Sequence, residues 1–141
     1  AIRDWGHAKD YIEIQWKILQ QENPDDYVVA TGRQESVRKF IDLAAKQLGW
    51  GGIFWEGSGV DEIGRRKDNQ KVVIKIDKKY FRPCEVNTLV GDSTKANKKL
   101  GWYPKTKLEE LVADMIKNDK ELAKKEALLI QKGYELNIPK E

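Results

Sequence analysis

The chain has 141 residues, 40% of them hydrophobic and 35% charged, with 26 basic against 23 acidic side chains. This length falls within the usual range of about 100–200 residues per domain, so we expect one domain over residues 1–141 and exclude a complete two-domain enzyme. The composition excludes collagen-like and disordered proteins. No apolar run approaches the roughly 20 residues that span a bilayer, so we expect no membrane contact.

The rare residue types bear on compartment and on metal binding. Cys84 is the only cysteine, so the chain cannot form an internal disulfide, which fits a cytoplasmic protein. Because His7 is the only histidine, we expect no zinc site. The chain begins at Ala1 with neither an initiator methionine nor a signal region, so we expect it to be cut from a longer polypeptide.

The predicted elements start with a short extended segment over residues 2–5. Apolar side chains at helical spacing then predict a helix from Ala8 to the turn at residues 22–26, which contains proline and Asx residues. The β-branched segment 27–30 predicts a buried strand.

The middle of the chain is expected to alternate between helix and strand. Ser36 is predicted to cap a second helix, which stops at Gly49. A short strand is predicted over residues 53–55, and a surface loop over the polar residues 57–70. Residues 71–77 alternate between apolar and polar side chains and predict a half-buried strand.

The last third is predicted to be helical. Asp92 and the following serine are expected to cap a short helix closed by Gly101. Residues 106–109 match a capping box at the start of the next helix, and a further charged helical stretch extends to Gln131. This order of elements predicts an α/β fold class, in the form of a small mixed lobe of short strands and helices.

Two partial motifs for cofactor chemistry fail on inspection. Residues 57–59 begin like a dinucleotide-binding loop, but Glu62 stands where the third glycine belongs. Tyr103 and Lys107 have the spacing of a proton-relay dyad. Pro104 follows the tyrosine directly, however, and the next helix is expected to begin only after it, so the two side chains would not share a helix face.

The remaining candidates also have structural interpretations. Nothing local activates the thiol of Cys84, which we expect to be a small buried residue, and we expect His7 to be a helix cap or a packing group. The five tryptophans lie on separate predicted elements, so packing roles are favoured over a base-stacking platform. We therefore assign no catalytic residue to this chain.

The most informative segment is Tyr80-Phe81-Arg82-Pro83-Cys84-Glu85-Val86. Pro83 disfavours helical backbone at Arg82, which places Arg82 at a bend with Glu85 about one turn further on. A guanidinium can donate two hydrogen bonds to a phosphate, and a carboxylate can accept from two vicinal hydroxyls, so this pair suits a nucleoside diphosphate. A local ion pair between the two residues is the alternative. Arg3 has a similar ambiguity, because the aspartate and the tryptophan that follow it could simply anchor its side chain.

Several motifs together resemble the C-terminal portion of the GDP-mannose 4,6-dehydratase family, in order and in spacing, over roughly residues 3–120. They are Arg3-Asp4-Trp5-Gly6-His7-Ala8-Lys9-Asp10-Tyr11, Ala30-Thr31-Gly32 with Ser36-Val37-Arg38, Tyr80-Phe81-Arg82-Pro83 with Glu85-Val86, Gly91-Asp92 with Thr94-Lys95-Ala96, and Leu100-Gly101-Trp102 with Pro104.

The resemblance implies a substrate-binding lobe that packs on a Rossmann domain absent from this chain. It also implies an NADP-dependent conversion of GDP-mannose to GDP-4-keto-6-deoxy-mannose by a homo-oligomeric full-length enzyme, with NADP and the catalytic residues in the N-terminal part. Residue by residue, it implies that Arg3 and Arg82 bind the diphosphate and that Glu85 accepts hydrogen bonds from the ribose. Asp10 and Trp5 are taken as structural. This chain alone is expected to be inactive.

The sequence departs from the family's usual residues at Arg33, Glu35, Lys39 and Cys84. The departures at Arg33 and Glu35 leave open how their loop meets substrate or a neighbouring subunit. Two other functions remain open: another nucleotide-sugar epimerase or dehydratase, and a non-catalytic module that binds nucleotides or nucleic acid. The second is suggested by the excess of lysine in the second half of the chain, although lysines interleaved with acidic residues favour solvated helix faces, so we expect no nucleic-acid partner.

Overall fold

The computed structural model describes residues 1–82, 86 and 88–135. This part of the chain forms a mixed α/β arrangement, as predicted, with two small antiparallel sheets and four α-helices. The strands are β1 (Ile2–Asp4), β2 (Gln34–Ser36), β3 (Ile53–Glu56), β4 (Ile63–Arg66) and β5 (Val72–Lys75). The helices are α1 (Ala8–Leu19), α2 (Val37–Gln47), α3 (Thr94–Leu100) and α4 (Leu108–Gln131), with 3-10 turns η1 (Gly59–Asp61) and η2 (Lys78–Tyr80).

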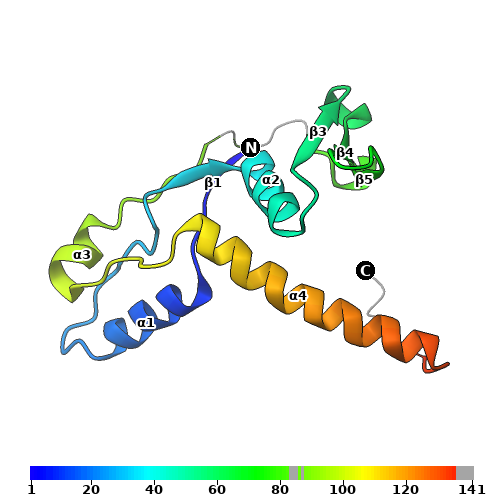
Figure 1. Ribbon diagram of the computed structural model, residues 1–141. Helices are drawn as coiled ribbons and strands as arrows, with labels where there is room; N and C mark the ends of the chain where they lie inside the picture. Colours follow the sequence, from blue (N-terminus) through cyan, green and yellow to red (C-terminus); the bar gives the residue numbers. More distant parts are fainter. Residues whose placement is uncertain (83–85, 87, 136–141) are drawn as a thin grey trace.

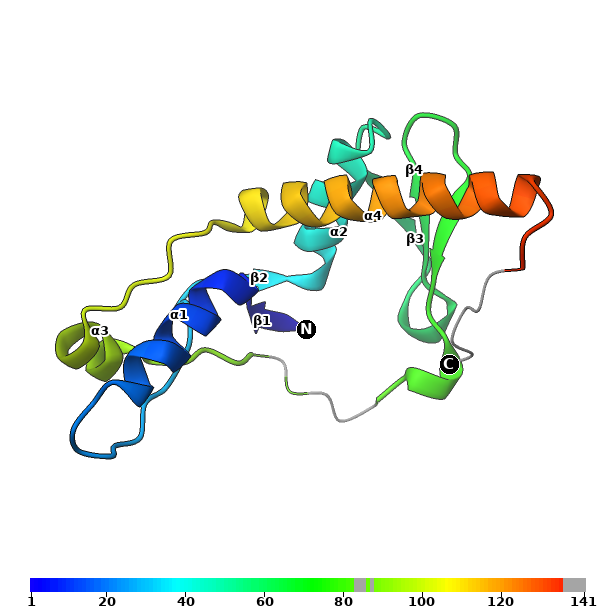
Figure 2. The same ribbon diagram turned by 90° about the horizontal axis from the view of Figure 1, so that it is seen from below.

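The elements are spread along an elongated molecule (Figures 1 and 2). Both views place α1 and α3 at one end and the three-stranded sheet at the other, with β1, β2 and α2 between them. Helix α4 packs against α2, and its C-terminal half extends away from α1 and α3. No helix in the described part of the chain is both long enough and apolar enough to cross a bilayer.

The first sheet joins β1 and β2 in antiparallel register, with Arg3 opposite Glu35. The carboxylate of Asp4 at the end of β1 accepts hydrogen bonds from the backbone N–H groups of Thr31 and Gly32, both at 2.8 Å. The turn before β2 is thereby anchored to β1, because a charged acceptor strengthens both bonds.

The second sheet has the order β3-β4-β5, and its central strand corrects a prediction. Residues 57–70 were expected to be a surface loop, but they contain η1 and β4. Gly64 in β4 is buried, and a Cβ added there would lie 3.0 Å from side-chain atoms of both Ile53 and Ile74. Because glycine has no side chain, the isoleucines of the two outer strands can pack over the central strand. A strand that packs in this way has no alternating apolar pattern in its sequence, so it was not predicted.

The segment 27–30 was predicted to be a buried strand, and this is wrong. Val28 and Val29 are 52% and 36% exposed in an irregular segment. Only Ala30 is buried, where it packs against the backbone at Gly91. The β-branched composition expresses a preference for strand, but none of the residues that the structure describes pairs with this segment.

The main core lies between α1 and α3. Ile14 of α1 packs with Ala96, Leu100 and Trp102, and all four are at most 8% exposed. The indole Nε1 of Trp102 donates to the backbone oxygen of Asp10 at 2.9 Å. One large aromatic ring therefore fills the space between the helices and satisfies its polar atom there.

Most predicted helix ends are confirmed. Ser36 Oγ accepts from the N–H of Lys39 at 3.1 Å at the start of α2, and Gly49 just beyond its end has φ +78°. Gly101 ends α3 with φ +59°. These local side-chain and left-handed backbone features are the ones that sequence patterns record well.

Helix α4 differs from its prediction in two ways. The two expected helical stretches form one 24-residue helix. Its N-cap is Lys107, one residue later than the predicted capping box, and the N–H of Lys107 donates to Glu110 Oε2 at 3.1 Å. Lysine has no acceptor in its side chain, so the return contact from Glu110 carries the capping at this end.

Candidate functional site

Strand β1 brings Arg3 next to the segment that carries the predicted phosphate-binding residues. The guanidinium Nη1 of Arg3 donates to the backbone oxygens of Ile2 and Val86, both at 2.9 Å. Ile2 also forms a parallel bridge with Thr88. Two motifs more than eighty residues apart in the sequence therefore lie side by side. A ligand site shared by Arg3 and the segment that follows Arg82 requires this proximity.

Arg82 lies on a cavity of about 620 Å³. Turn η2 leads the chain into this position, and Asp77 Oδ1 caps the turn by accepting from the N–H of Lys79 at 2.9 Å. The Arg82 side chain is exposed, and it makes no hydrogen bond or ion pair with any described residue. The lining residues are Ala1, Val37, Lys75, Ile76, Asp77, Tyr80, Phe81 and Arg82.

Among the described residues, Arg3 and Arg82 do not line a common cavity. Arg3 is not among the described residues that line the Arg82 cavity; its link to the site is the contact with Val86. Glu85, the predicted ribose-binding residue, lies outside the described residues, as do Pro83 and Cys84. The convergence of Arg3, Arg82 and Glu85 on one ligand therefore stays a prediction.

Lys75 is a cavity residue that sequence analysis did not single out. It is the last residue of β5, it is exposed, and its ammonium makes no hydrogen bond or ion pair with any described residue. The alternation along β5 shows that Lys75 leaves the sheet on the face opposite Ile74. Its place on the same cavity as Arg82 depends on the path of the chain through η2, which no motif encodes.

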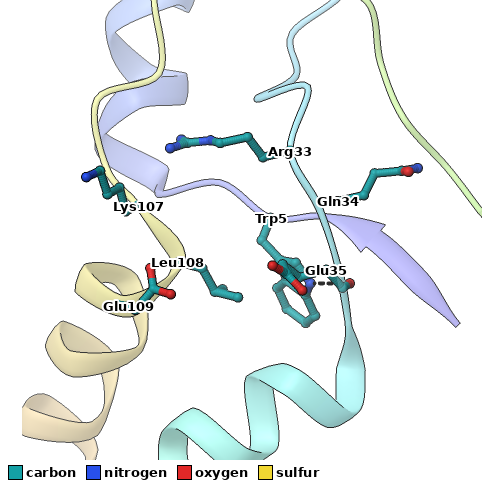
Figure 3. Close-up of a pocket in the computed structure, with 7 residues that line it drawn as sticks. All are labelled: Trp5, Arg33, Gln34, Glu35, Lys107, Leu108 and Glu109. Carbon is teal, nitrogen blue, oxygen red and sulfur yellow. Dashed lines mark hydrogen bonds between the residues drawn. The ribbon is translucent and has the colours of Figure 1, made fainter.

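A second cavity, of about 300 Å³, lies between β2 and the start of α4 (Figure 3). Its lining residues are Trp5, Arg33, Gln34, Glu35, Lys107, Leu108 and Glu109. Two basic and two acidic side chains share this cavity, so it offers no net charge to a ligand. In Figure 3 the amide of Gln34 points away from the other labelled side chains, and its buried Nε2 has no hydrogen-bond partner among the described residues.

The contacts at this second cavity are structural. Arg33 Nη2 donates to the backbone oxygen of Thr106 at 2.8 Å, which joins the turn before β2 to the start of α4. Trp5 Nε1 donates to the backbone oxygen of Glu35 at 2.9 Å, and the indole stacks on Phe40 with ring centroids 4.6 Å apart. The interpretation of Trp5 as a packing residue fits these contacts.

The other candidates for chemistry also have structural surroundings. His7 is the N-cap of α1, where Nδ1 accepts from the N–H of Lys9 at 3.0 Å and Nε2 lies 3.2 Å from Asp114 Oδ2. Tyr103 is 61% exposed in the segment before α4, whereas Lys107 caps that helix. Within the described ranges, no group of three or more histidine, cysteine or acidic residues is placed to hold a metal ion.

Comparison with known proteins confirms the resemblance. The family model described as GDP-mannose 4,6 dehydratase matches residues 1–115. The chain is 53% identical over 119 residues to GDP-mannose 4,6 dehydratase 2 of Caenorhabditis elegans, a match that covers 84% of this chain and 31% of that relative. It is 47% identical to GDP-mannose 4,6-dehydratase of Vibrio cholerae serotype O1, over 98% of this chain and 39% of the relative.

The human relative gives the same result. GDP-mannose 4,6 dehydratase of Homo sapiens is 48% identical over 122 residues, which are 86% of this chain and 32% of that protein. The chain thus spans between 31% and 39% of the length of these three relatives. It belongs to the GDP-mannose 4,6-dehydratase family.

Proposed function

We propose that this chain is the substrate-binding part of a GDP-mannose 4,6-dehydratase, an enzyme that converts GDP-mannose to GDP-4-keto-6-deoxy-mannose. The observation that carries the proposal is the exposed guanidinium of Arg82 on a 620 Å³ cavity, beside the strand of Arg3, within a chain that the family model matches over residues 1–115. An exposed arginine that lines a cavity and makes no hydrogen bond or ion pair with any described residue is suited to a phosphate ligand.

Each predicted binding residue has a defined role in this proposal. Arg82 donates paired hydrogen bonds to the diphosphate, and Arg3 adds positive charge from the neighbouring strand while it holds the segment through Val86. Glu85 accepts hydrogen bonds from the ribose hydroxyls. The lobe therefore orients the nucleotide, and the sugar extends toward groups that belong to another part of the enzyme.

The described residues do not fit NADP, the hydride carrier that this reaction uses. A pyrophosphate of this kind binds where a strand leads through a glycine-rich turn into the N-terminus of a helix. Here Gly57 and Gly59 lead instead into η1 and then strand β4. We therefore place NADP, with the catalytic residues, on a Rossmann domain outside this chain, and we place the whole enzyme in the cytoplasm as a homo-oligomer.

Calorimetric titration of the full-length polypeptide with GDP and with UDP tests the proposal. We expect GDP to bind more tightly than UDP. Arg82→Ala should weaken GDP binding by about ten- to a hundredfold, because a hydrogen bond to a charged group contributes about 1.5–3 kcal/mol. Lys78→Ala is the control, because Lys78 is exposed in the adjacent turn and is not among the described residues that line the cavity.

Two results would contradict the proposal. Unchanged GDP affinity in Arg82→Ala would remove the assigned phosphate contact. A preference for UDP would instead favour a different nucleotide-sugar epimerase or dehydratase.

A further inference from the structure

The cavity that contains Arg82 presents a second cation. Lys75 ends β5, and its side chain lines the same cavity seven residues before Arg82. Neither cation makes a hydrogen bond or ion pair with any described residue. Asp77 is the one acidic side chain among the described lining residues, and its Oδ1 accepts from the backbone N–H of Lys79.

The walls of this cavity favour an anionic ligand with an apolar part. Tyr80 and Phe81 are 60% and 47% exposed, although large aromatic residues are usually covered in a protein of this size. Val37 and Ile76 add aliphatic surface. Low-polarity walls reduce the local screening of charge, so each cation attracts a phosphate more strongly there than on an open surface.

The proposed function gives Arg82 and Arg3 to the diphosphate, but Arg3 is not among the described residues that line the cavity, so Arg82 and Lys75 are the two described cations on the cavity itself. A guanidinium donates paired hydrogen bonds in a fixed planar geometry, whereas an ammonium acts as a point charge on a flexible stem that can reach a neighbouring group. Two cations of these two types match a ligand with two linked phosphates.

We propose that Lys75 is a second diphosphate-binding residue of this site and shares the ligand with Arg82. The inference rests on the proposed function, since it takes the diphosphate to be the ligand of Arg82. It adds a contact that neither the motif nor the family name assigns. In this arrangement Lys75 contributes charge and Arg82 contributes directed hydrogen bonds.

Three variants of the full-length polypeptide test this role through GDP affinity at low and at high ionic strength. Lys75→Gln should weaken GDP binding about three- to tenfold, and the loss should shrink at high salt because the lost interaction is electrostatic and partly exposed. Lys75→Arg should restore affinity to within about twofold of the unsubstituted protein, because it keeps the charge. Lys71→Gln makes the same charge change at an exposed residue that the described cavity lining does not include, and should have no effect.

The outcomes separate this inference from the proposed function. If Arg82→Ala weakens GDP binding while Lys75→Gln does not, the role of Lys75 is wrong and the proposed function stands. Equal losses of GDP affinity in Lys75→Gln and Lys71→Gln would also overturn the role of Lys75, because both would then reflect only the overall charge of the protein. If Arg82→Ala has no effect, the proposed function fails and this inference fails with it. Unchanged thermal unfolding of each variant shows that the fold is intact.

Discussion

Asp10 is the residue that ties the helical end of the molecule together. It is 4% exposed, and its Oδ2 accepts from the backbone N–H groups of Lys105 and Thr106 at 3.1 and 3.0 Å. Its own backbone oxygen accepts from Trp102. A buried carboxylate is tolerated where it is hydrogen-bonded, so Asp10 holds the segment before α4 against α1.

Replacing Asp10 tests this role. We expect Asp10→Ala to lower the free energy of unfolding by about 2–4 kcal/mol, because two partly buried N–H groups lose a charged acceptor. Asp10→Asn keeps an oxygen at the same place and should cost less. Urea denaturation measures both, with Asp119→Ala on the exposed face of α4 as a control that should change the value by less than about 0.5 kcal/mol. A loss in Asp10→Ala no larger than in the control would contradict the structural role.

The proposed binding residues show what sequence can and cannot predict at this scale. Arg82 could be singled out as a candidate from the sequence because the proline and its neighbours form a recognisable motif. The contact of Arg3 with Val86 and the presence of Lys75 at the Arg82 cavity could not be derived, because both depend on how distant segments come together. No local pattern records a neighbour that is eighty residues away.

Among the elements, helices were predictable and strands less so. The ends of α2 and α3 follow from Ser36, Gly49 and Gly101, whose effect is confined to one turn of backbone. Strand β4 was missed because its place is set by β3 and β5 on either side. The segment 27–30 was predicted as a strand for the opposite reason, since it has the composition of one without a partner among the described residues.

The close approach of two irregular segments at Gly91 gives a prediction for this scale. A Cβ added at Gly91 would lie 2.3 Å from the Cβ of Ala30, so one backbone must move. We expect Gly91→Ala to lower the free energy of unfolding by about 1–3 kcal/mol through overpacking. Combined with Ala30→Gly, which removes the opposing methyl group, it should cost less than the two single substitutions added together. Strict additivity in urea denaturation would show that the two segments do not touch.

The turn after α1 is joined to α3 by an exposed charge cluster. Asp25 lies 2.5 Å from the ammonium of Lys95 and 3.0 Å from that of Lys99. Hydrogen bonds from Lys95 and then Lys99 hold the pKa of the Asp25 carboxyl well below its ordinary value of 3.8. Because the folded pKa is the lower one, this stabilisation is complete above pH 3.8 and is lost as the pH falls through the folded pKa.

An NMR titration of the carboxyl groups checks this cluster. In low salt, the titration midpoint of Asp25 should lie below the ordinary value of 3.8, and substitution of both Lys95→Gln and Lys99→Gln should raise it toward that value. High salt should act in the same direction, because the cluster is open to solvent. If neither the lysine substitutions nor high salt shifts the titration midpoint of Asp25, the two lysines do not contact Asp25 in solution.

At the scale of the whole molecule, the surface of α1 is unusual for a complete domain. Ile12, Trp16 and Leu19 follow one another at helical spacing and are 63%, 62% and 80% exposed. The opposite side of α1 packs in the core, where Ile14 contacts residues of α3. Packing roles are favoured for all five tryptophans, but the described residues leave Trp16 62% exposed. A packing role for Trp16 would need a surface outside the described residues.

The proposed Rossmann domain would supply that surface, and Trp16 can report it. In the 141-residue chain alone, Trp16→Gln should change the free energy of unfolding by less than about 0.5 kcal/mol, because the side chain is already in water. In the full-length polypeptide the same substitution should cost about 1–3 kcal/mol, because a buried aromatic surface would be lost. Asp119→Ala, at an exposed residue of α4, should have equal effects in both contexts. Equal effects of Trp16→Gln in the two contexts would mean that Trp16 does not contact the proposed Rossmann domain.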